Sequence, residues 1–330
     1  MTGPHPGRIV THDDFDGIAS AAVASHVLKI DRFAFAGPRA IAESKLSVSG
    51  TDVVCDLPCP SECGMWFDHH EGNLEDLKYR GIDPVSIPGA FAAKPSCARV
   101  VFDFFSAGGS LPDRFSLLAD EADVIDSFAY AGIEEWRRET PAKMIETCLK
   151  LDQDKSGRDP FMASLVRNLR DRPLGQVAED AGIRAMALRY RAEEESMLEQ
   201  VGRDASFLPG DAGREVILLD LTKHNRNPRI VKNLAYLLYP KALAVLEIRN
   251  RFERGIKTND LHVSLSLSLN LNGVEHSRDV GEIMRSLNIG DGHRGAGAGA
   301  LSCRSKPEML KRKEKLLSDI YDLWRKQAHD

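Results

Sequence analysis

The sequence predicts an α/β protein of two domains, and three observations support this. The chain has 330 residues, about twice the length of an average domain. In its first part, short apolar segments typical of buried strands alternate with helical apolar spacing, which favours a parallel sheet with helices on both faces. The Pro- and Gly-containing segment 206–215 interrupts this pattern, and further strands and helices follow.

We therefore expect a domain at 1–201, a linker at 202–213, a smaller α/β domain at 214–305 and a terminal helix at 306–330, with a cleft between the two domains.

The first domain is expected to alternate strands and helices. Buried strands are predicted from short apolar runs at 8–12, 33–37, 51–56 and 65–68. Helices are predicted at 17–30, 39–46, 96–107, 113–130, 141–151, 159–170 and 174–201. This order indicates a parallel sheet with both faces covered by helices.

The second domain shows the same elements in a different order. Strands are predicted at 215–221, 242–249 and 261–270, the last of which alternates strictly between apolar and polar residues. Residues 227–238 resemble a helix begun by Pro228, because proline is favoured in a first helical turn. Residues 307–326 carry charges on one face and apolar side chains on the other, as expected of a helix packed on the domain.

Composition excludes several classes of protein. The chain has 44 Lys and Arg against 49 Asp and Glu, a net charge of −5, so it has no basic excess to hold a long duplex. No apolar run approaches the roughly 18 residues that span a bilayer, and the N-terminus lacks the apolar core of a signal peptide. Six cysteines in this length do not indicate a disulfide framework. We expect a cytoplasmic enzyme or binding protein.

Acidic and imidazole side chains follow three of the predicted strands: His12, Asp14, Asp16, Asp56, Asp68, His69 and His70. Ligands of open parallel sheets bind beyond the carboxyl ends of the strands, so these groups should meet there. Carboxylates that close together would repel one another and take up protons unless divalent cations were bound. Oxygen mixed with imidazole nitrogen suits Mn²⁺, Fe²⁺, Co²⁺ or Zn²⁺ better than Ca²⁺. For any one Asp, capping of the following helix is the alternative.

These residues resemble a known family. HDDFDG at 12–17 is similar to the His-x-Asp-x-Asp-Gly motif of the DHH phosphoesterase superfamily, and Asp-His-His at 68–70 is similar to the motif that names it. Asp56 stands where the second motif has a lone Asp. The segment EADVIDS resembles the fourth motif of the family, and Asp123 matches the Asp of that motif. Asp126, one helical turn further on the same face, is the alternative.

The resemblance continues into the second half. GDGHRGAGAGAL at 290–301 is similar to the glycine-histidine loop of the DHH-associated domain. The resemblance therefore covers about 8–130 and 214–303, in the order seen in RecJ, nanoRNase and exopolyphosphatase-like enzymes.

The resemblance implies a two-metal hydrolase. One cation would be held by His12, Asp14 and Asp56. The other would be held by Asp16, Asp56, His69 and Asp123, with Asp56 bridging the two. Two cations would activate a water that attacks phosphorus, with Mn²⁺ preferred over Mg²⁺, Co²⁺ or Fe²⁺. As catalytic residues, Asp68 would orient a histidine, and His70 would face the scissile phosphate or support the second metal.

The glycine-rich segment also has an interpretation from its residues alone. Glycines permit positive φ and close backbone approach, so their amides can converge on an anion. A tight connection between a strand and a helix is the alternative. We expect the substrate-binding residues to be Gly292, His293, Arg294 and Gly295, together with Arg99 of the first domain.

One position departs from the family. Its members often have a Val-Ser-x-Arg-Ser strand before the loop, whose Arg binds substrate phosphate. Here Ser266 stands in place of that Arg, after Val263 and Ser264. Arg294, Arg278 and Arg304 remain as groups that could supply the charge.

The function implied is hydrolysis of small phosphate esters or anhydrides with a free end. The substrate stays open among a short single-stranded oligonucleotide, a cyclic-dinucleotide product, 3′-phosphoadenosine phosphate and polyphosphate. A family II inorganic pyrophosphatase, which shares the first domain, is the alternative of the same class. A non-catalytic phosphate or nucleotide sensor on the same fold is the alternative of another class. No membrane contact is expected, and a homodimer is left open.

Overall fold

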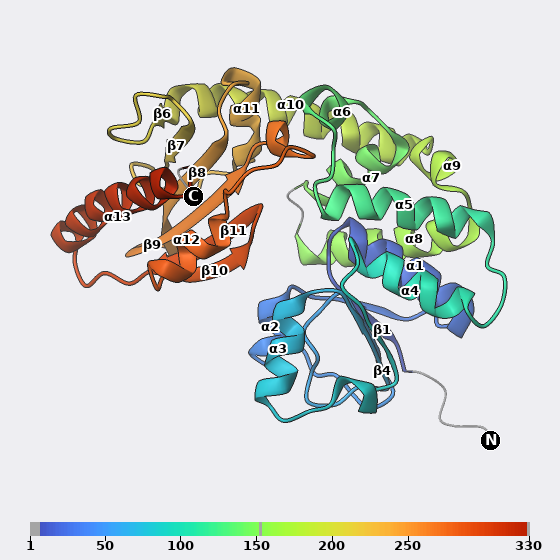
Figure 1. Ribbon diagram of the computed structural model, residues 1–330. Helices are drawn as coiled ribbons and strands as arrows, with labels where there is room; N and C mark the ends of the chain where they lie inside the picture. Colours follow the sequence, from blue (N-terminus) through green and yellow to red (C-terminus); the bar gives the residue numbers. More distant parts are fainter. Residues whose placement is uncertain (1–6, 152–153, 329–330) are drawn as a thin grey trace. The chain divides into compact units, whose positions relative to one another are not determined.

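The computed structural model describes residues 7–151 and 154–328 and has the predicted α/β fold class (Figure 1). It divides into two compact units. The first holds the chain up to Ala129 together with Arg138–Tyr190, and the second holds Tyr130–Arg137 and the chain from Arg191 onward. In the described part, none of the helices has the length and apolar character needed to cross a membrane.

The sheet of the first unit is parallel throughout, as predicted. Its strands are β1 (Ile9–Thr11), β2 (Phe33–Phe35), β3 (Val53–Cys55), β4 (Met65–Asp68) and β5 (Gly89–Phe91). The order is β2-β1-β3-β4-β5, so β1, β3 and β4 are neighbours. The residues that follow these three strands therefore emerge side by side at one edge of the sheet.

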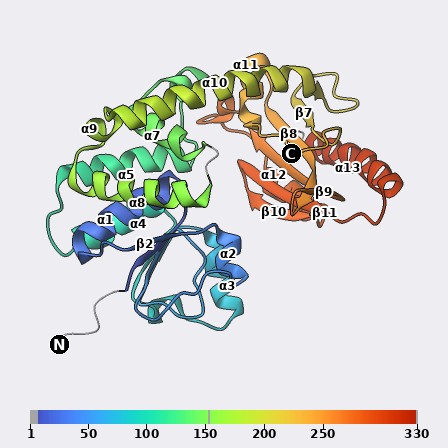
Figure 2. The ribbon, with the colours of Figure 1, turned by 180° about the vertical axis from the view of Figure 1, so that it is seen from behind.

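Helices cover both faces of this sheet (Figures 1 and 2). On one face, Ile9, Val53 and Phe67 share a buried apolar cluster with the helices α1 (Phe15–Leu28), α4 (Cys97–Ser106), α5 (Asp113–Asp126), α7 (Pro141–Leu149), α8 (Lys155–Asp171) and α9 (Leu174–Ala178). On the other face, Val10, Val54 and Trp66 pack with α2 (Pro38–Ala42) and α3 (Glu71–Tyr79). Helix α1 is buried from Phe15 to Ser25, and its many Ala, Ser and Gly residues let neighbouring helices approach closely.

The second unit contains a mixed sheet in the order β10-β11-β9-β8-β7-β6. Its strands are β6 (Ala205–Phe207), β7 (Val216–Asp220), β8 (Ala244–Glu253), β9 (Ile256–Leu267), β10 (Gly290–His293) and β11 (Ala296–Leu301). Only β7 and β8 pair in parallel among these described strands; the other neighbours are antiparallel. One face carries the buried apolar cluster shared with α12 (Val280–Ser286) and α13 (Lys306–Lys326), including Trp324 of α13.

Two helix predictions are wrong in their extent. Residues 174–201 form two helices, α9 and α10 (Ala181–Asp204), with a turn at Asp180 between them. Residues 227–238 form only the 3-10 turn η2 (Lys232–Leu234) and α11 (Ala235–Leu238). The β-branched Ile230 and Val231 favour extended backbone, and Val231 has φ −95° and ψ 103°.

The segment 202–213, expected to be a linker, holds the end of α10, strand β6 and a turn. The remaining elements are α6 (Ile133–Arg137), η1 (Pro84–Ser86) and η3 (Leu269–Leu271).

Candidate metal centre

Asp56 lies at the centre of the acidic edge of the first sheet. Its Oδ2 is 3.4 Å from His12 Nδ1, and its Oδ1 is 3.6 Å from His69 Nε2 and 3.8 Å from His70 Nδ1. Asp56 is only 2% exposed, and within the described residues neither carboxylate oxygen has a hydrogen-bond partner. Because buried polar groups are normally hydrogen-bonded, these two oxygens require another partner.

The backbone of Asp56 is strained. Its φ is +57°, in the left-handed region that non-glycine residues rarely adopt, at a cost of order 1–3 kcal/mol. A hydrogen bond of 3.0 Å, donated by Asp56 N to Phe67 O, holds this backbone in position. It joins the turn after β3 to strand β4. The fold therefore stabilises an unfavourable backbone conformation that directs this carboxylate towards the histidines.

The loop after β1 supplies His12 and Asp14. Asp14 caps helix α1, since its Oδ1 accepts from Gly17 N at 2.9 Å, while its Oδ2 lies 2.7 Å from His12 Nδ1. A Cβ at Gly17 would lie 2.3 Å from His12 O, so only glycine permits this close approach. Burial alone would lower the pKa of His12, but the carboxylates of Asp14 and Asp56 raise it to about 11. The site thus favours a positive charge at this position.

His69 is oriented by the backbone. Its Nδ1 lies 3.0 Å from Lys94 O, which can only accept, so Nδ1 carries the hydrogen of a neutral ring. Its Nε2 faces Asp126 Oδ2 at 3.4 Å and Asp16 Oδ2 at 3.7 Å, and is buried without a hydrogen-bond partner in the described chain. Burial opposes protonation, but Asp56 and Asp126 raise the pKa of His69 to about 9. A proton or a metal ion can occupy Nε2.

Asp16 is held at the N-terminus of a second helix. Its Oδ2 accepts from Cys97 N at 2.7 Å and its Oδ1 from Ala98 N at 2.8 Å, in the first turn of α4. Burial, with the nearby carboxylates of Asp56 and Asp126, raises the pKa of Asp16 well above its usual value. These repulsions among carboxylates would be relieved by bound cations.

Asp126, rather than Asp123, lies with the other candidate ligands. Asp123 Oδ1 accepts from Ser96 Oγ at 2.6 Å, and its Oδ2 accepts from Arg99 Nε at 2.9 Å. Asp126, at the end of α5, groups with Asp16 and His69. Burial, followed by the charge of Asp56, raises the pKa of Asp126 to about 6.

Arg99, expected at the substrate, lies with Asp120 and Asp123. Its Nη2 is 2.8 Å from Asp123 Oδ2 and also contacts Asp120. Ser96 caps α4, because its Oγ accepts a 3.1 Å hydrogen bond from Arg99 N. The guanidinium of Arg99 therefore has two carboxylate partners within its own unit.

Asp68 orients His70. Its Oδ1 lies 2.9 Å from His70 Nδ1, and its Oδ2 accepts from Asn73 Nδ2 at 2.6 Å. Asp68 is fully buried, whereas the side chain of His70 is 52% exposed. The hydrogen bond with Asp68 raises the pKa of His70. No sequence motif identifies Asn73, which reaches Asp68 because it lies in the first turn of α3.

Asp13, the variable position of the first motif, faces a different partner. Its Oδ2 lies 2.9 Å from Arg158 Nη1, and its backbone O accepts from Arg158 Nη2 at 3.2 Å. Arg158 lies in α8, far along the chain, so no local pattern could have identified this contact.

The described residues fit a centre for divalent cations. Three groups each bring their donor atoms within 4.8 Å of one another: His12, Asp14 and Asp56; Asp16, His69 and Asp126; and Asp56, Asp68, His69 and His70. The groups share Asp56 and His69, whose unpartnered atoms are the two Asp56 oxygens and His69 Nε2. Mixed carboxylate and imidazole donors of this kind suit first-row divalent metals.

The glycine-rich segment 290–301 is a β-hairpin, not a loop. Strands β10 and β11 pair from Gly290 with Gly299 to His293 with Ala296. The expectation of positive φ is wrong, because none of its glycines is among the positive-φ residues of the described chain. The expectation of close approach is correct: a Cβ at Gly292 would lie 2.3 Å from Ala296 O.

His293 is exposed at the end of β10, while Arg294 and Gly295 form the turn of this hairpin. Arg294 Nε donates to Arg278 O at 3.1 Å.

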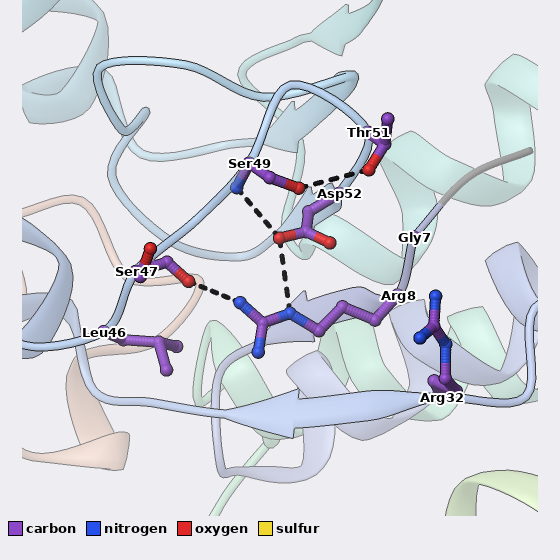
Figure 3. A pocket seen from close by; sticks show the side chains of 8 residues that line it. All are labelled: Gly7, Arg8, Arg32, Leu46, Ser47, Ser49, Thr51 and Asp52. Atoms are coloured by element: carbon purple, nitrogen blue, oxygen red, sulfur yellow. Dashed lines mark hydrogen bonds and ion pairs between the residues drawn. The ribbon is translucent and has the colours of Figure 1, made fainter. Parts of the chain in front are cut away.

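A cavity of about 440 Å³ opens at the other edge of the first sheet (Figure 3). Its lining residues are Gly7, Arg8, Arg32, Leu46, Ser47, Ser49, Thr51 and Asp52. They precede β1, β2 and β3, and Arg8 Nε donates to Asp52 Oδ2 at 3.3 Å. Since ligands of parallel sheets bind beyond the carboxyl ends, this cavity is distinct from the metal centre.

No protein-family model and no curated protein matches the sequence. Solved structures match its fold. A pGpG-specific phosphodiesterase, PggH from Vibrio cholerae, has a TM-score of 0.67 at 20% identity, covering 96% of this chain and 99% of that one. The DHH domain of a member of a family of ribosomal proteins has a TM-score of 0.52 at 12% identity, covering 96% of this chain and 86% of that one.

RecJ from Thermus thermophilus, in complex with Mn²⁺, has a TM-score of 0.49 at 17% identity, covering 94% of this chain and 52% of that one.

Proposed function

We propose that this chain, which has the fold of the DHH phosphoesterase superfamily, is a cytoplasmic metal-dependent phosphohydrolase. The observation that carries the proposal is Asp56, a buried carboxylate whose two oxygens have no hydrogen-bond partner among the described residues, at the meeting point of three histidines. A carboxylate in this position stabilises the fold poorly by itself, because its desolvation has no compensating hydrogen bond. It is suited to holding cations.

The ligand sets follow from the three groups of donors. His12, Asp14 and Asp56 would hold one cation, and Asp16, Asp56, His69 and Asp126 would hold the other. When bound, two divalent cations, with Mn²⁺ preferred, would neutralise phosphate oxygens and lower the pKa of a water. Asp126, the alternative to Asp123 in the fourth motif, would be the ligand, because Asp123 is engaged by Ser96 and Arg99.

His70 and Asp68 would serve the leaving group. Asp68 fixes the ring of His70 through Nδ1, which leaves Nε2 available for a substrate. Because the hydrogen bond with Asp68 raises the pKa of His70, the imidazole holds a proton at neutral pH more readily. We propose that His70 donates this proton to the departing oxygen, while Asn73 keeps Asp68 in place.

The proposed substrates are small phosphate esters with a free end. The net charge of −5 argues against long nucleic acid. A linear dinucleotide comes first among the candidates, because a pGpG-specific phosphodiesterase shares the fold over 99% of its own length. Short oligonucleotides, 3′-phosphoadenosine phosphate and polyphosphate remain in the same class.

A metal-dependent hydrolysis screen tests the proposal. The full chain, stripped with EDTA and then supplied with Mn²⁺, is incubated with pGpG, a tetranucleotide, 3′-phosphoadenosine phosphate, pyrophosphate and polyphosphate. We expect Mn²⁺-dependent product release from at least one ester or anhydride, and none from the Asp56→Asn variant. Binding of these compounds without turnover would favour a phosphate or nucleotide sensor and contradict the proposal.

A further inference from the structure

The cavity at the amino edge of the first sheet is formed by three segments that lie far apart in the sequence (Figure 3). Arg8 directly precedes β1, Arg32 directly precedes β2, and residues 46–52 lead into β3. Strands β1 and β3 run in parallel away from the cavity and end before His12 and Asp56. A ligand in the cavity would therefore lie at the opposite edge of the sheet from the candidate metal centre.

A buried carboxylate fixes the first cation of this cavity. Asp52 is 3% exposed, and its Oδ2 accepts from Arg8 Nε at 3.3 Å and from Ser49 N at 3.0 Å. Arg8 Nη2 donates to Ser47 O. Because a buried carboxylate is costly without its partner, this contact holds the guanidinium in one position. Nη1 of Arg8 has no hydrogen-bond partner among the described residues, so it remains a preorganised donor.

Arg32 is the second cation. It is exposed, and within the described part of the chain its guanidinium makes no hydrogen bond or ion pair. The adjacent acid, Asp31, is engaged by Arg167 at 3.0 Å and by Arg170 at 2.9 Å. The lining residues of the cavity thus carry two guanidinium groups against the one carboxylate of Asp52, although the whole chain has a net charge of −5.

Hydroxyl groups add neutral donors to these cations. Ser47, Ser49 and Thr51 line the cavity, and Ser49 Oγ lies 3.1 Å from Thr51 Oγ1. A hydroxyl group donates one hydrogen bond and accepts others, so such a pair can still engage a ligand. Leu46 supplies an apolar side chain among the lining residues. Cationic and hydroxyl donors beside one apolar side chain suit an oxyanion that carries an organic group.

Gly7 keeps two of the segments close together. Its N donates to Thr51 O at 2.6 Å, and a Cβ at this position would lie 2.7 Å from Asp52 Oδ1 and 2.8 Å from Thr51 Oγ1. A larger residue would push apart the segments that hold Arg8 and Asp52. The cavity is therefore held in shape by the backbone as well as by the ion pair.

A structural clamp is the alternative explanation of the ion pair. Arg8 and Asp52 alone could serve only to tie the start of β1 to the start of β3. That role leaves Arg32 unexplained, because its cation has no partner among the described residues yet lines the same cavity. The volume of about 440 Å³ is also in the range of sites that hold small organic molecules.

We propose that this cavity binds a small phosphate monoester, whose phosphate oxygens accept hydrogen bonds from Arg32 and from Nη1 of Arg8. Guanidinium groups match phosphate in geometry and charge, and the serine and threonine hydroxyls can donate to the remaining oxygens. The organic part of the ligand would lie against Leu46. This ligand is distinct from the substrate of the proposed hydrolytic centre, and the inference does not depend on that centre being active.

Calorimetric titration of the full chain in EDTA, at low ionic strength, tests the proposal. The probes are ribose 5-phosphate, inorganic phosphate, ribose and acetate. Arg32→Gln should bind ribose 5-phosphate at least about tenfold more weakly than wild type, since it removes one charged hydrogen-bond donor. Arg138→Gln is the matched control, because Arg138 is an exposed arginine of the first unit that also has no ion pair in the described chain. It should bind like wild type.

Two further measurements separate this site from folding and from the metal centre. Thermal unfolding of Arg32→Gln should match that of wild type, since Arg32 has no partner to lose among the described residues. Asp56→Asn should bind ribose 5-phosphate like wild type, because Asp56 lies at the other edge of the sheet.

Four results would overturn the proposal. They are a wild-type protein that binds neither phosphate probe, ribose or acetate that binds as tightly as ribose 5-phosphate, an Arg32→Gln variant that binds like Arg138→Gln, and loss of binding in Asp56→Asn. The last result would place the ligand at the metal centre. Failure of hydrolysis in the Mn²⁺ screen leaves all these binding results unaffected.

Discussion

At the scale of residues, the proposed metal centre combines groups that sequence could identify with one, Asp126, that sequence could not distinguish from its neighbour Asp123. His12, Asp14, Asp16, Asp56 and the Asp-His-His triad follow strands directly, so a strand pattern places them together. Asp123 and Asp126 lie one turn apart on the same helical face. Which of them reaches His69 depends on contacts between α4 and α5, above all on Arg99 and Ser96 binding Asp123. Local pattern does not contain that information.

Substitutions in α5 distinguish the two acids. Asp126→Asn should lower Mn²⁺ affinity and reduce hydrolysis by several orders of magnitude, with no loss of metal-free stability, because it removes a carboxylate from a repulsive group. Asp123→Asn should cost about 1–3 kcal/mol of unfolding free energy, since it removes the negative charge that pairs with Arg99 and replaces one of the two acceptor oxygens by a donor. Its activity should fall only about 10–100-fold. The reverse ranking in metal titration would assign the ligand to Asp123.

Lys232 gives the stability of the protein a specific pH dependence. The pKa of Lys232 is about 8 in the folded chain, below the ordinary lysine value of 10.5 that applies in the unfolded chain. Between those values the unfolded chain retains a proton that the folded chain has lost, so folding becomes more favourable as pH rises. Lys232→Met should therefore exceed wild type in unfolding free energy by about 1–3 kcal/mol at pH 7, and the gap should narrow by pH 10. Urea denaturation of both proteins from pH 7 to pH 10 measures this difference in unfolding free energy. A difference that stays constant with pH would contradict the prediction.

At the scale of elements, short strands limit what a sequence can reveal. Strand β5 has only three residues and begins with Gly89, so it shows no apolar pattern. The hairpin of β10 and β11 consists mainly of Gly and Ala, which favour turns and helices over strands. The four strands that carry Ile, Val and Phe in the first unit, in contrast, are predicted by the sequence together with their parallel direction.

The turn into α1 should depend on one glycine. A Cβ at Gly17 would lie 2.3 Å from His12 O and 2.8 Å from His12 C, so Gly17→Ala must displace the backbone that carries His12. We expect a loss of about 1–3 kcal/mol in unfolding free energy and weaker Mn²⁺ binding. Gly72→Ala is the control: that glycine lies in α3 with nothing within 4 Å, and alanine there should stabilise by about 0.4–1 kcal/mol. Equal effects of the two substitutions in chemical denaturation would contradict the packing argument.

At the scale of the whole molecule, the two units supply different chemistry. The first gathers carboxylates and imidazoles at the carboxyl edge of a parallel sheet, and the second presents cations and hydroxyl groups on one face of a mixed sheet. Alternating strands and helices were sufficient to predict the α/β class. That Lys232, Arg249 and His262 lie near one another could not be predicted, because they come from three separate elements and belong to no motif.

The central claim is that the acidic edge of the first sheet is a two-cation centre organised by Asp56. Equilibrium dialysis against Mn²⁺, with metal content measured per chain, tests it in wild type, Asp56→Asn and Asp13→Asn. Asp13 is the matched control, since its carboxylate pairs with Arg158 at 2.9 Å and belongs to none of the donor groups, although its Oδ1 lies 3.7 Å from His12 Nε2. We expect about two Mn²⁺ per chain for wild type and Asp13→Asn, and fewer than one for Asp56→Asn. Equal metal content in all three proteins, or none in wild type, would contradict it.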